Sequence, residues 1–560
     1  MSTSPPLPRP ALVTRDAAAR LPRWALLLFS AAYLLPGLVG RDPWRGADLA
    51  AFGQMLAIAE GRSPWLNPML GGVPTDAALL PHWLGAAAIL ITQPWLDPAL
   101  AARLPFALLL ALAFAGTWYA AYHLARGDAA QPLPLAFGGE AEPQDYARAM
   151  ADAALLALMA TLGLLQMGHE TTPELAQLAV VAGLLWALAA ARRRVSRVAV
   201  LLLLPALAAC GAPTLALVLG AGALALSLRR ADPDARRQAP WLAAALLLAA
   251  LAAWPVHSWA WRLAALPEPM PLLRLWLWYL WPVWPLAVWT LWRWRHHLGE
   301  RHLALPGLVA GVGLAACLGM GGSDRALLLG LPGFAVLAAF ALPTLQRTTA
   351  AAVDWFSVFF FSLAALLIWV ISSSMFLGVP SKPAANIARL APGYESSIGA
   401  LTIVSAALGT GLWLALVRWR TGRHRSALWK SLVLPAGGVA LCWLLLMTLW
   451  LPLLDYARSN RPLVQRLSPH LPPAGACVAA PGAAPSLVAA LEFHGRWPVR
   501  AASTEVVGLC ERLLLVVRGT TAHPLADAVQ AAGWREVARV RRPTDRQEWT
   551  VVYRRSASAR

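Results

Sequence analysis

Long apolar runs alternate with short polar segments along the first 455 residues of the chain. The runs at 24–40, 102–125, 303–320, 352–378 and 396–417 have about the length that a helix needs to cross a bilayer. Further apolar runs lie at 81–97, 149–167, 174–191, 198–228, 239–261, 275–292, 326–345 and 427–454. The pattern predicts an all-α polytopic membrane protein with about thirteen transmembrane helices.

The run 198–228 is too long for a single straight crossing, because a helix of this length spans about 46 Å. The segment CGAP at 210–213 interrupts the run, and clustered arginines flank it on both sides. Positive residues gather on the cytoplasmic side of membrane proteins. We therefore expect two short half-passes, or a re-entrant pair, that return to the side of entry.

The side on which HETTPE (169–174) lies depends on the segment 81–125. If the runs 81–97 and 102–125 both cross the membrane, HETTPE lies inside; if they make one net crossing, it lies outside. The basic loop at 192–197 favours the second arrangement. The loops 293–302 and 418–430 are also strongly basic and are expected in the cytoplasm, which places the chain after residue 455 outside.

The composition changes after Leu454, where short β-like runs alternate with helix-like ones. Residues 456–560 are expected to form a small, soluble, extracytoplasmic α/β domain that follows a transmembrane domain at 24–455 and a cytoplasmic tail at 1–23. Cys477 and Cys510 each lie near an expected strand. A disulfide between them is expected in an oxidising compartment, and two free thiols are the alternative.

Composition supports membrane insertion, since 58% of the residues are hydrophobic and only 13% are charged. The net charge of +19 would also suit a nucleic-acid-binding protein. The arginines, however, stand in short clusters between apolar runs, which fits cytoplasmic loops and anionic lipids better than a nucleic-acid groove. We expect membrane lipids among the partners, and no nucleic acid.

The polar loop at 41–83 is the first candidate for a reaction site. It holds Asp42, Asp48, Asp76 and His82 in a chain that is poor in charge. Carboxylates beside a bilayer cost free energy unless they face water, a partner or a substrate. An ordinary solvated loop is the alternative. Within it, residues 47–58 have helical composition and precede helix breakers, which predicts a short helix along the membrane surface.

Common catalytic and nucleotide-binding motifs are missing from the sequence. It has no P-loop, dinucleotide-binding glycine fingerprint, CxxC pair or HExxH in the context that each requires. Solute transport would predict charges in the middle of helices and two repeated halves with broken helices. The sequence shows few charges of this kind and no clear internal repeat. The acids instead gather in outward loops near helix ends. This distribution is typical of an enzyme that acts on a lipid-borne substrate.

The order of features around the first loop resembles a known family. An anchor helix precedes a loop with DPW (42–44) and an acid, followed by EGRSPWLNPMLGG (60–72), a second acid and an apolar run headed by Trp83. This order resembles the integral membrane glycosyltransferases of the GT-C fold, above all the branch of the protein O-mannosyltransferases and the lipid A aminoarabinose transferase. The stretch SDRALLLGLPGFAVLAAFALP (323–343) and the general shape of the C-terminal domain also resemble this branch.

The resemblance implies a GT-C-like fold and a polyprenyl-phosphate sugar donor. The sugar would pass to a lipid, glycan or protein acceptor of unknown identity, on the periplasmic side of a bacterial inner membrane. A component that binds or exports lipid-linked glycans without catalysis is the alternative function.

The family's motifs are only partly present in the first loop. Asp48 matches the acid of an Asp-Glu pair whose second position is Leu49 here. Asp76 matches an acid that the family follows with Lys and Pro, whereas Ala77 and Ala78 follow it here. The phosphate-binding lysine is therefore missing.

The later motifs place further candidates. Thr172-Pro173 matches the family's second outside acid, with Glu170 and Glu174 on either side, and Arg325 precedes the Leu-Pro stretch. The resemblance implies that a carboxylate takes the acceptor's proton and that cations balance the leaving phosphate.

We expect Asp48 to be the general base, and Asp42, Asp76 and His82 to bind substrate. Phosphate contacts are expected from Arg325, Arg262, Arg274 and Lys382. His169, Glu170 and Glu174 would orient the acceptor or a divalent metal, the only cofactor considered, although helix capping by HETTPE is the stronger expectation.

Overall fold

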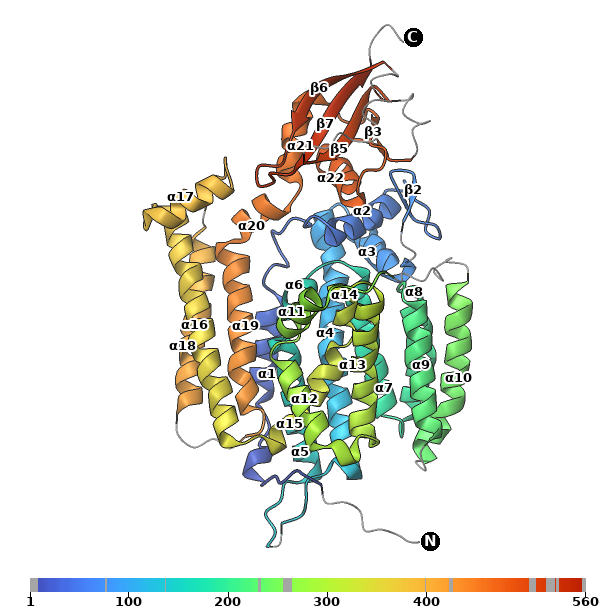
Figure 1. Cartoon of the computed structure of the whole chain (residues 1–560), viewed down its shortest axis with the longest axis vertical. Helices are drawn as coiled ribbons and strands as arrows, with labels where there is room; N and C mark the ends of the chain where they lie inside the picture. The colour runs from blue at the N-terminus through green and yellow to red at the C-terminus, as the bar shows by residue number, and fades with distance from the viewer. Residues whose placement is uncertain are drawn as a thin grey trace.

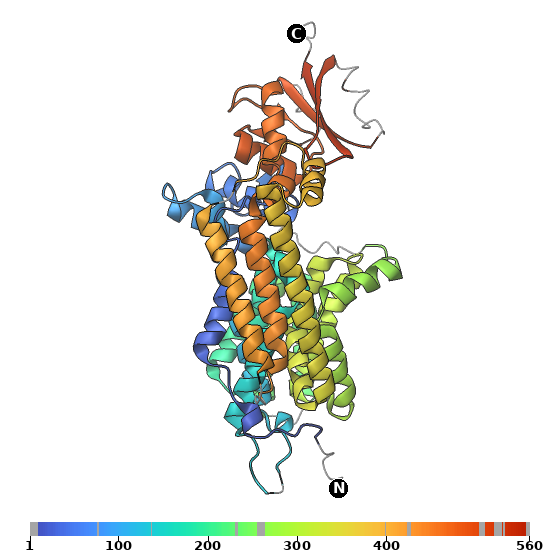
Figure 2. The same cartoon turned by 90° about the vertical axis from the view of Figure 1, so that its left-hand side faces the viewer.

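The computed structural model describes residues 9–75, 78–135, 137–229, 233–254, 264–397, 399–422, 427–502, 510–519, 529 and 533–555. The helices form an elongated bundle that carries a small sheet domain on one end (Figures 1 and 2). We call this the domain-bearing end. The opposite end, which we call the N-terminal end, holds residues 9–22 with the short helix η1 (Asp16–Ala18).

The centre of the bundle is built from α4 (Pro98–Ala125), α5 (Pro143–Ala160), α7 (Pro173–Ala189), α12 (Val283–Arg293), α13 (Arg301–Gly319) and α15 (Leu331–Ala341). Small residues let these helices approach closely. A Cβ on Gly116 of α4 would lie 2.8 Å from the backbone carbon of Ala182 on α7. Close approach of backbones is how helices gain packing energy in a membrane, where lipid competes for apolar contacts.

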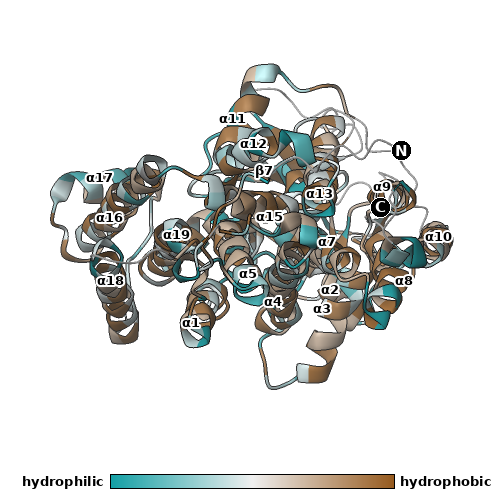
Figure 3. Cartoon of the chain, turned by 90° about the horizontal axis from the view of Figure 1, so that it is seen from below, coloured by the Kyte–Doolittle hydropathy of each residue, from teal (hydrophilic) through white to brown (hydrophobic). Residues whose placement is uncertain are grey.

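Two further groups flank this centre (Figure 3). On one side stand α16 (Arg347–Leu377), α18 (Ala400–Thr421) and α19 (Lys430–Leu449), with α1 (Arg23–Leu34) against α19. On the other side stand α8 (Arg194–Ala209), α9 (Pro213–Leu228) and α10 (Pro233–Ala253). Seen along the bundle, the helices are mostly hydrophobic, as expected for a membrane domain.

Five helices within the described ranges are long and apolar enough to cross a membrane: α4, α13, residues 348–377 of α16, α18 and α19. The expected number of about thirteen crossings is therefore not confirmed. Several apolar runs are interrupted. The run 275–292 is divided between α11 (Pro269–Tyr279) and α12 at Pro282, and the run 326–345 between α14 (Asp324–Leu328) and α15. Proline lacks the N–H that would continue a helix.

The long run 198–228 forms two helices, α8 and α9, that pack side by side (Figure 1). The turn between them contains Gly211, whose φ of +85° favours glycine. Both outer ends of the pair lie at the N-terminal end of the bundle. The pair thus returns to its starting side, as the basic flanks predicted.

Short elements cover the domain-bearing end: α2 (Ala47–Ala59), the hairpin of β1 (Met69–Leu70) and β2 (Val73–Pro74), α3 (Leu79–Thr92), α6 (Leu162–Met167), α17 (Ser381–Leu390) and α20 (Leu451–Arg458). Helices α2 and α3 lie across this end, whereas α4 runs along the bundle (Figure 1). The segment 81–125 therefore makes one net crossing, and HETTPE lies at the domain-bearing end. Helix α2 is where the sequence predicted a helix, and α22 of the C-terminal domain packs on it, so that most of its residues are buried. Its expected position along the membrane surface stays a prediction.

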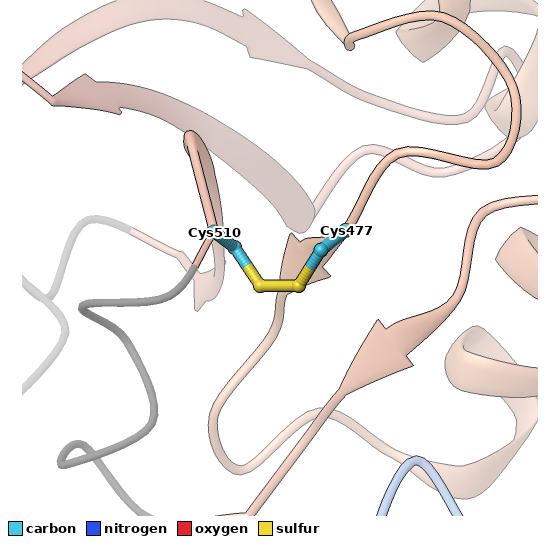
Figure 4. Close-up of a disulfide and its surroundings, with 2 residues drawn as sticks. All are labelled: Cys477 and Cys510. Atoms are coloured by element: carbon cyan, nitrogen blue, oxygen red, sulfur yellow. A yellow bond between two sulfur atoms is a disulfide. The ribbon is translucent and has the colours of Figure 1, made fainter.

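The C-terminal domain contains a five-stranded sheet of order β4-β3-β5-β7-β6. Its elements are α21 (Arg461–Leu467), β3 (Val478–Ala479), α22 (Pro485–Gly495), β4 (Val499–Arg500), β5 (Arg512–Arg518), β6 (Trp534–Val540) and β7 (Glu548–Arg555). Strand β3 is parallel to β4 and β5, and β7 is antiparallel to β5 and β6. A disulfide joins Cys477 to Cys510 (Figure 4), the pairing expected from the sequence.

Candidate functional site

Two glutamates of HETTPE meet Arg325 at the domain-bearing end. Arg325 Nη2 donates to Glu170 Oε2 at 2.7 Å, and its Nη1 lies 3.6 Å from Glu174 Oε2. Glu170 is buried in the loop before α7, whereas the side chains of Glu174 and Arg325 are about one quarter exposed. Burial raises the pKa of Glu170, and the negative charge of Asp48 adds to this, while Arg325 and Gln166 act against it. The sequence predicted all three residues, and the fold brings them together.

Asp48 lies in the first turn of α2 and is buried. Its Oδ1 accepts hydrogen bonds from the Thr171 backbone N–H at 2.7 Å and from Thr171 Oγ1 at 2.9 Å. Its Oδ2 accepts one from the Trp44 backbone N–H at 3.0 Å and lies 3.7 Å from Arg41 Nη2. Asp48 therefore ties the first loop to the residue next to Glu170.

His169 is held by backbone groups on both sides of its ring. Its Nδ1 lies 2.7 Å from the Leu165 carbonyl oxygen, and its Nε2 lies 2.8 Å from that of Tyr33. Arg41 donates to the carbonyl oxygen of His169. With both ring nitrogens against carbonyl oxygens, His169 has none left for a metal ion.

Arg458, at the end of α20, is a cation of this site that the sequence did not predict. Its Nη1 donates to Gln166 Oε1 at 2.6 Å, and Gln166 Nε2 donates to Glu170 Oε1 at 2.9 Å. The guanidinium also lies over the Trp44 ring, 5.1 Å from its centre. Within the described part of the chain, Arg458 forms no ion pair. It was missed because its partners come from segments far away in the sequence.

The remaining predicted residues do not join this group. Asp42 is bound by Arg461 of α21, His82 is buried within α3, and Arg274 of α11 and Lys382 of α17 are exposed. Helix α17 lies well apart from α14 (Figure 1). Asp76 and Arg262 fall outside the described residues.

The capping role expected for HETTPE is wrong. Thr172 occupies the N-cap position of α7, but its side chain makes no cap hydrogen bond and its Oγ1 has no partner. The hydroxyl of Thr171 binds Asp48 instead, and Glu170 and Glu174 bind Arg325. Tertiary partners replace the local contacts that the segment's composition suggested.

No three His, Cys, Asp or Glu side chains gather closely enough to hold a metal ion among the residues with a described position. Arginines provide the positive charge around Glu170 and Asp48. The divalent metal considered at this site stays a prediction, with Glu170 and Glu174, but not His169, left to hold it.

A large cavity of about 810 Å³ lies elsewhere, between α1, α18 and α19. Its lining is almost entirely apolar and includes only two charged residues, Asp16 and Arg20, at the N-terminal end. A pocket with so few polar groups can hold hydrocarbon, but it lacks the groups needed for acid, base or phosphate chemistry. We therefore place the candidate site at Glu170 and Arg325.

Comparison with known proteins identifies the fold. The crystal structure of ArnT from Cupriavidus metallidurans bound to undecaprenyl phosphate matches this chain with a TM-score of 0.60 and 15% sequence identity, over 96% of this chain and 97% of that chain. The apo structure of ArnT from the same organism matches over the same shares, with a TM-score of 0.59 and 14% identity. No family model and no curated protein matches the sequence. The chain has an ArnT-like GT-C fold.

Proposed function

We propose that the protein is a membrane glycosyltransferase that moves a sugar from a polyprenyl-phosphate donor to a lipid, glycan or protein acceptor. The observation that carries this proposal is the partly buried group of Glu170, Glu174 and Arg325 at the domain-bearing end, with the exposed Arg458 linked to it through Gln166. Charges held away from water cost free energy, and such groups cluster at functional sites. Undecaprenyl phosphate in the similar ArnT structure supports a polyprenyl phosphate as the donor lipid.

The proposed reaction exchanges one bond at the anomeric carbon of the sugar. The bond from this carbon to the phosphate oxygen breaks, and the polyprenyl phosphate leaves with the electron pair on that oxygen. The acceptor oxygen forms the new bond, and its proton passes to a carboxylate. Negative charge grows on the phosphate as the bond breaks, so fixed cations beside it lower the barrier.

Two carboxylates compete for the role of base. Asp48, the base expected from the sequence, accepts three hydrogen bonds. These hydrogen bonds occupy both of its oxygens, so fewer lone pairs are left to receive the proton of an acceptor. Glu174 Oε2 has no hydrogen-bond partner, and its side chain is 24% exposed. We propose Glu174 as the better-placed base, and we test Asp48 beside it.

Two arginines could face the leaving phosphate. Arg325 is shared between two carboxylates, so most of its charge is already balanced. Among the residues that the structure describes, the side chain of Arg458 has the neutral Gln166 and the Trp44 ring as its close partners. We propose that Arg458 contacts the donor phosphate and that Arg325 fixes the two glutamates. This role of Arg458 could replace the lysine missing after Asp76.

We further propose that the domain-bearing end faces the periplasm of a bacterial inner membrane. The basic segments 192–197, 293–302 and 418–422 lie at the N-terminal end (Figure 1), which the positive-inside rule assigns to the cytoplasm. A disulfide in the C-terminal domain fits an oxidising compartment.

Sugar transfer by the purified protein in lipid tests the proposal. Radiolabelled polyprenyl-phosphate sugars are offered to the wild type and to Glu174→Gln, Asp48→Asn and Arg458→Gln. We expect Glu174→Gln to lower turnover about a hundredfold or more, as loss of a general base does. We expect a drop of about tenfold to a hundredfold for Arg458→Gln, because one donor to the developing charge is lost.

Glu140→Gln serves as the matched control, because Glu140 is exposed and pairs with Thr14 of the N-terminal segment, so the change should leave turnover unchanged. If Asp48→Asn loses turnover while Glu174→Gln keeps it, and Asp48→Asn has a normal melting temperature, Asp48 and not Glu174 is the base. Binding of the lipid phosphate without release of any sugar would favour the non-catalytic binding or export role.

A further inference from the structure

The apolar cavity between α1, α18 and α19 contains none of the residues assigned to sugar transfer. Helices α1 and α18 each pack on α19, and the cavity of about 810 Å³ lies between them (Figure 3). Three large apolar residues of its lining, Trp24, Leu28 and Leu412, are 70%, 48% and 58% exposed. Exposed apolar side chains of a membrane domain face lipid, so the cavity is open to the bilayer.

The three walls of the cavity are about as long as one leaflet is thick. The lining covers residues 24–32 along α1, 409–419 along α18 and 429–444 along α19. At about 1.5 Å per residue, these stretches measure about 12, 15 and 22 Å. Half of the hydrocarbon core of a bilayer measures about 15 Å. All three walls start at the N-terminal end (Figures 1 and 2), so the cavity is suited to a lipid of the leaflet at that end.

Tryptophan rings mark the mouth of this cavity. Trp419, near the end of α18, stacks on Trp429, which precedes α19, with ring centres 6.2 Å apart and an angle of 8° between the planes. Trp24 lies in the first turn of α1 at the same end. Tryptophan side chains prefer the headgroup region of a bilayer. The mouth therefore lies at the depth of lipid headgroups.

The chain at the mouth is held by hydrogen bonds on both sides of Arg20. Trp429 Nε1 donates to the Ala19 carbonyl oxygen at 2.7 Å. The Leu21 backbone N–H donates to Asp152 Oδ2 of α5 at 2.9 Å. Arg20 itself is exposed and lines the cavity. Its place at the mouth is thus set by the packing of the helices.

The mouth carries more positive than negative charge. Besides Arg20, Arg23 and Arg418 are exposed and directly adjoin lining residues in the chain. The acids near them among the described residues are Asp16, which is in the lining, and the buried Asp152. Basic pockets between membrane helices on the cytoplasmic side bind anionic headgroups, and guanidinium groups pair with phosphate. The charge at the mouth is therefore complementary to an anionic headgroup.

We propose that this cavity binds one anionic phospholipid of the leaflet at the N-terminal end. Its phosphate would lie among Arg20, Arg23 and Arg418, and an acyl chain would lie along α19 between α1 and α18. The lipid would complete the packing between these two helices. The site does not depend on the proposed transferase function, and the donor phosphate keeps its place at the domain-bearing end.

Melting of the whole purified protein in detergent, followed by tryptophan fluorescence, tests the site. The added probes are phosphatidylglycerol, phosphatidylcholine and undecaprenyl phosphate. A ligand that binds only the folded state raises the melting temperature, and we expect phosphatidylglycerol to do so at lower concentration than phosphatidylcholine. Changing Arg20→Gln together with Arg418→Gln should raise the half-maximal concentration of phosphatidylglycerol about tenfold or more.

Two further variants complete the experiment. Arg194→Gln together with Arg229→Gln is the matched control, because both are exposed arginines at the N-terminal end and outside the cavity. This pair should respond to phosphatidylglycerol as the wild type does. Ala32→Phe keeps all the arginines but places a ring in the cavity, and it should lose the response.

Equal half-maximal concentrations in the wild type and the Arg20, Arg418 pair would overturn the site. An equal response of the wild type to phosphatidylcholine would overturn the anionic headgroup. The response to undecaprenyl phosphate should be the same in every variant, and its loss in Ala32→Phe would assign the cavity to the polyprenyl chain instead. If Ala32→Phe does not fold, the comparison of the two arginine pairs decides alone.

Discussion

The acids near the first loop differ in how much of their charge the protein already uses. Asp48 is surrounded by donors, Glu170 is shared by Gln166 and Arg325, and Glu174 keeps an oxygen without a hydrogen bond. Burying a carboxylate in a membrane protein costs free energy, so each buried one is expected to have hydrogen-bond or ionic partners, or a functional role. This oxygen of Glu174, which faces Arg325 Nη1 at 3.6 Å without a hydrogen bond, is the feature by which we separate the reacting acid from the anchoring ones.

Asp455 gives a residue-scale prediction. Burial raises its pKa to about 6, whereas an aspartate in the unfolded chain titrates near about 4. Between these values the folded state binds more protons than the unfolded state, so stability from this group falls as pH rises through the window. We therefore compare the melting temperatures of the wild type and of Asp455→Asn at about pH 4 and about pH 7. We expect the wild type to lose stability relative to the variant as the pH rises. The same difference at both pH values would contradict this.

Sequence reasoning found the acids of this site more readily than its cations. Asp48, Glu170, Glu174 and Arg325 stand out because charge is rare in the chain. Arg458 and Arg41 do not, because arginines are common between apolar runs and their partners lie far away in sequence. Only the fold shows which arginine faces a carboxylate, an aromatic ring or an open cleft.

At the scale of elements, α2 is the piece that joins the two domains. It lies under α22, and Gly53 faces Ala489 of α22 so closely that a Cβ would not fit between them. The helical composition of 47–58 and the breakers after it predicted the helix correctly, but a composition apolar on all sides cannot tell a helix on a membrane from one between two protein layers. The breaks in 275–292 and 326–345 escaped prediction for the same reason, because hydropathy stays high across them.

Gly53→Ala tests this packing. A Cβ at position 53 would lie 2.3 Å from the Cβ of Ala489 and 3.2 Å from its Cα, and neither atom can rotate away. We expect a loss of about 1 to 3 kcal/mol from overpacking, only partly offset by alanine's helix propensity. Gly307→Ala on α13 is the control, since a Cβ there meets nothing within 4 Å. Equal melting temperatures for the two variants would mean that the domain is not seated closely on α2.

At the scale of the whole molecule, the polar chemistry and the C-terminal domain share one end, and the basic loops share the other. This division, the bundle and the small α/β domain followed from the alternation of apolar and polar runs. The number of crossings did not, because many of the described apolar helices have only 10–17 residues. The seating of the domain over α2 also needed the fold, since no local pattern encodes a contact between residues 53 and 489.

The most direct measurement is a structure of the protein in lipid with undecaprenyl phosphate bound. We predict that the phosphate lies at the domain-bearing end, within hydrogen-bonding distance of Arg458 and next to the Arg325 group. Arg458→Gln should lose that density and keep the fold. A phosphate seated at the N-terminal end, beside the apolar cavity of α1, α18 and α19, would contradict the placement of the reaction at Glu174.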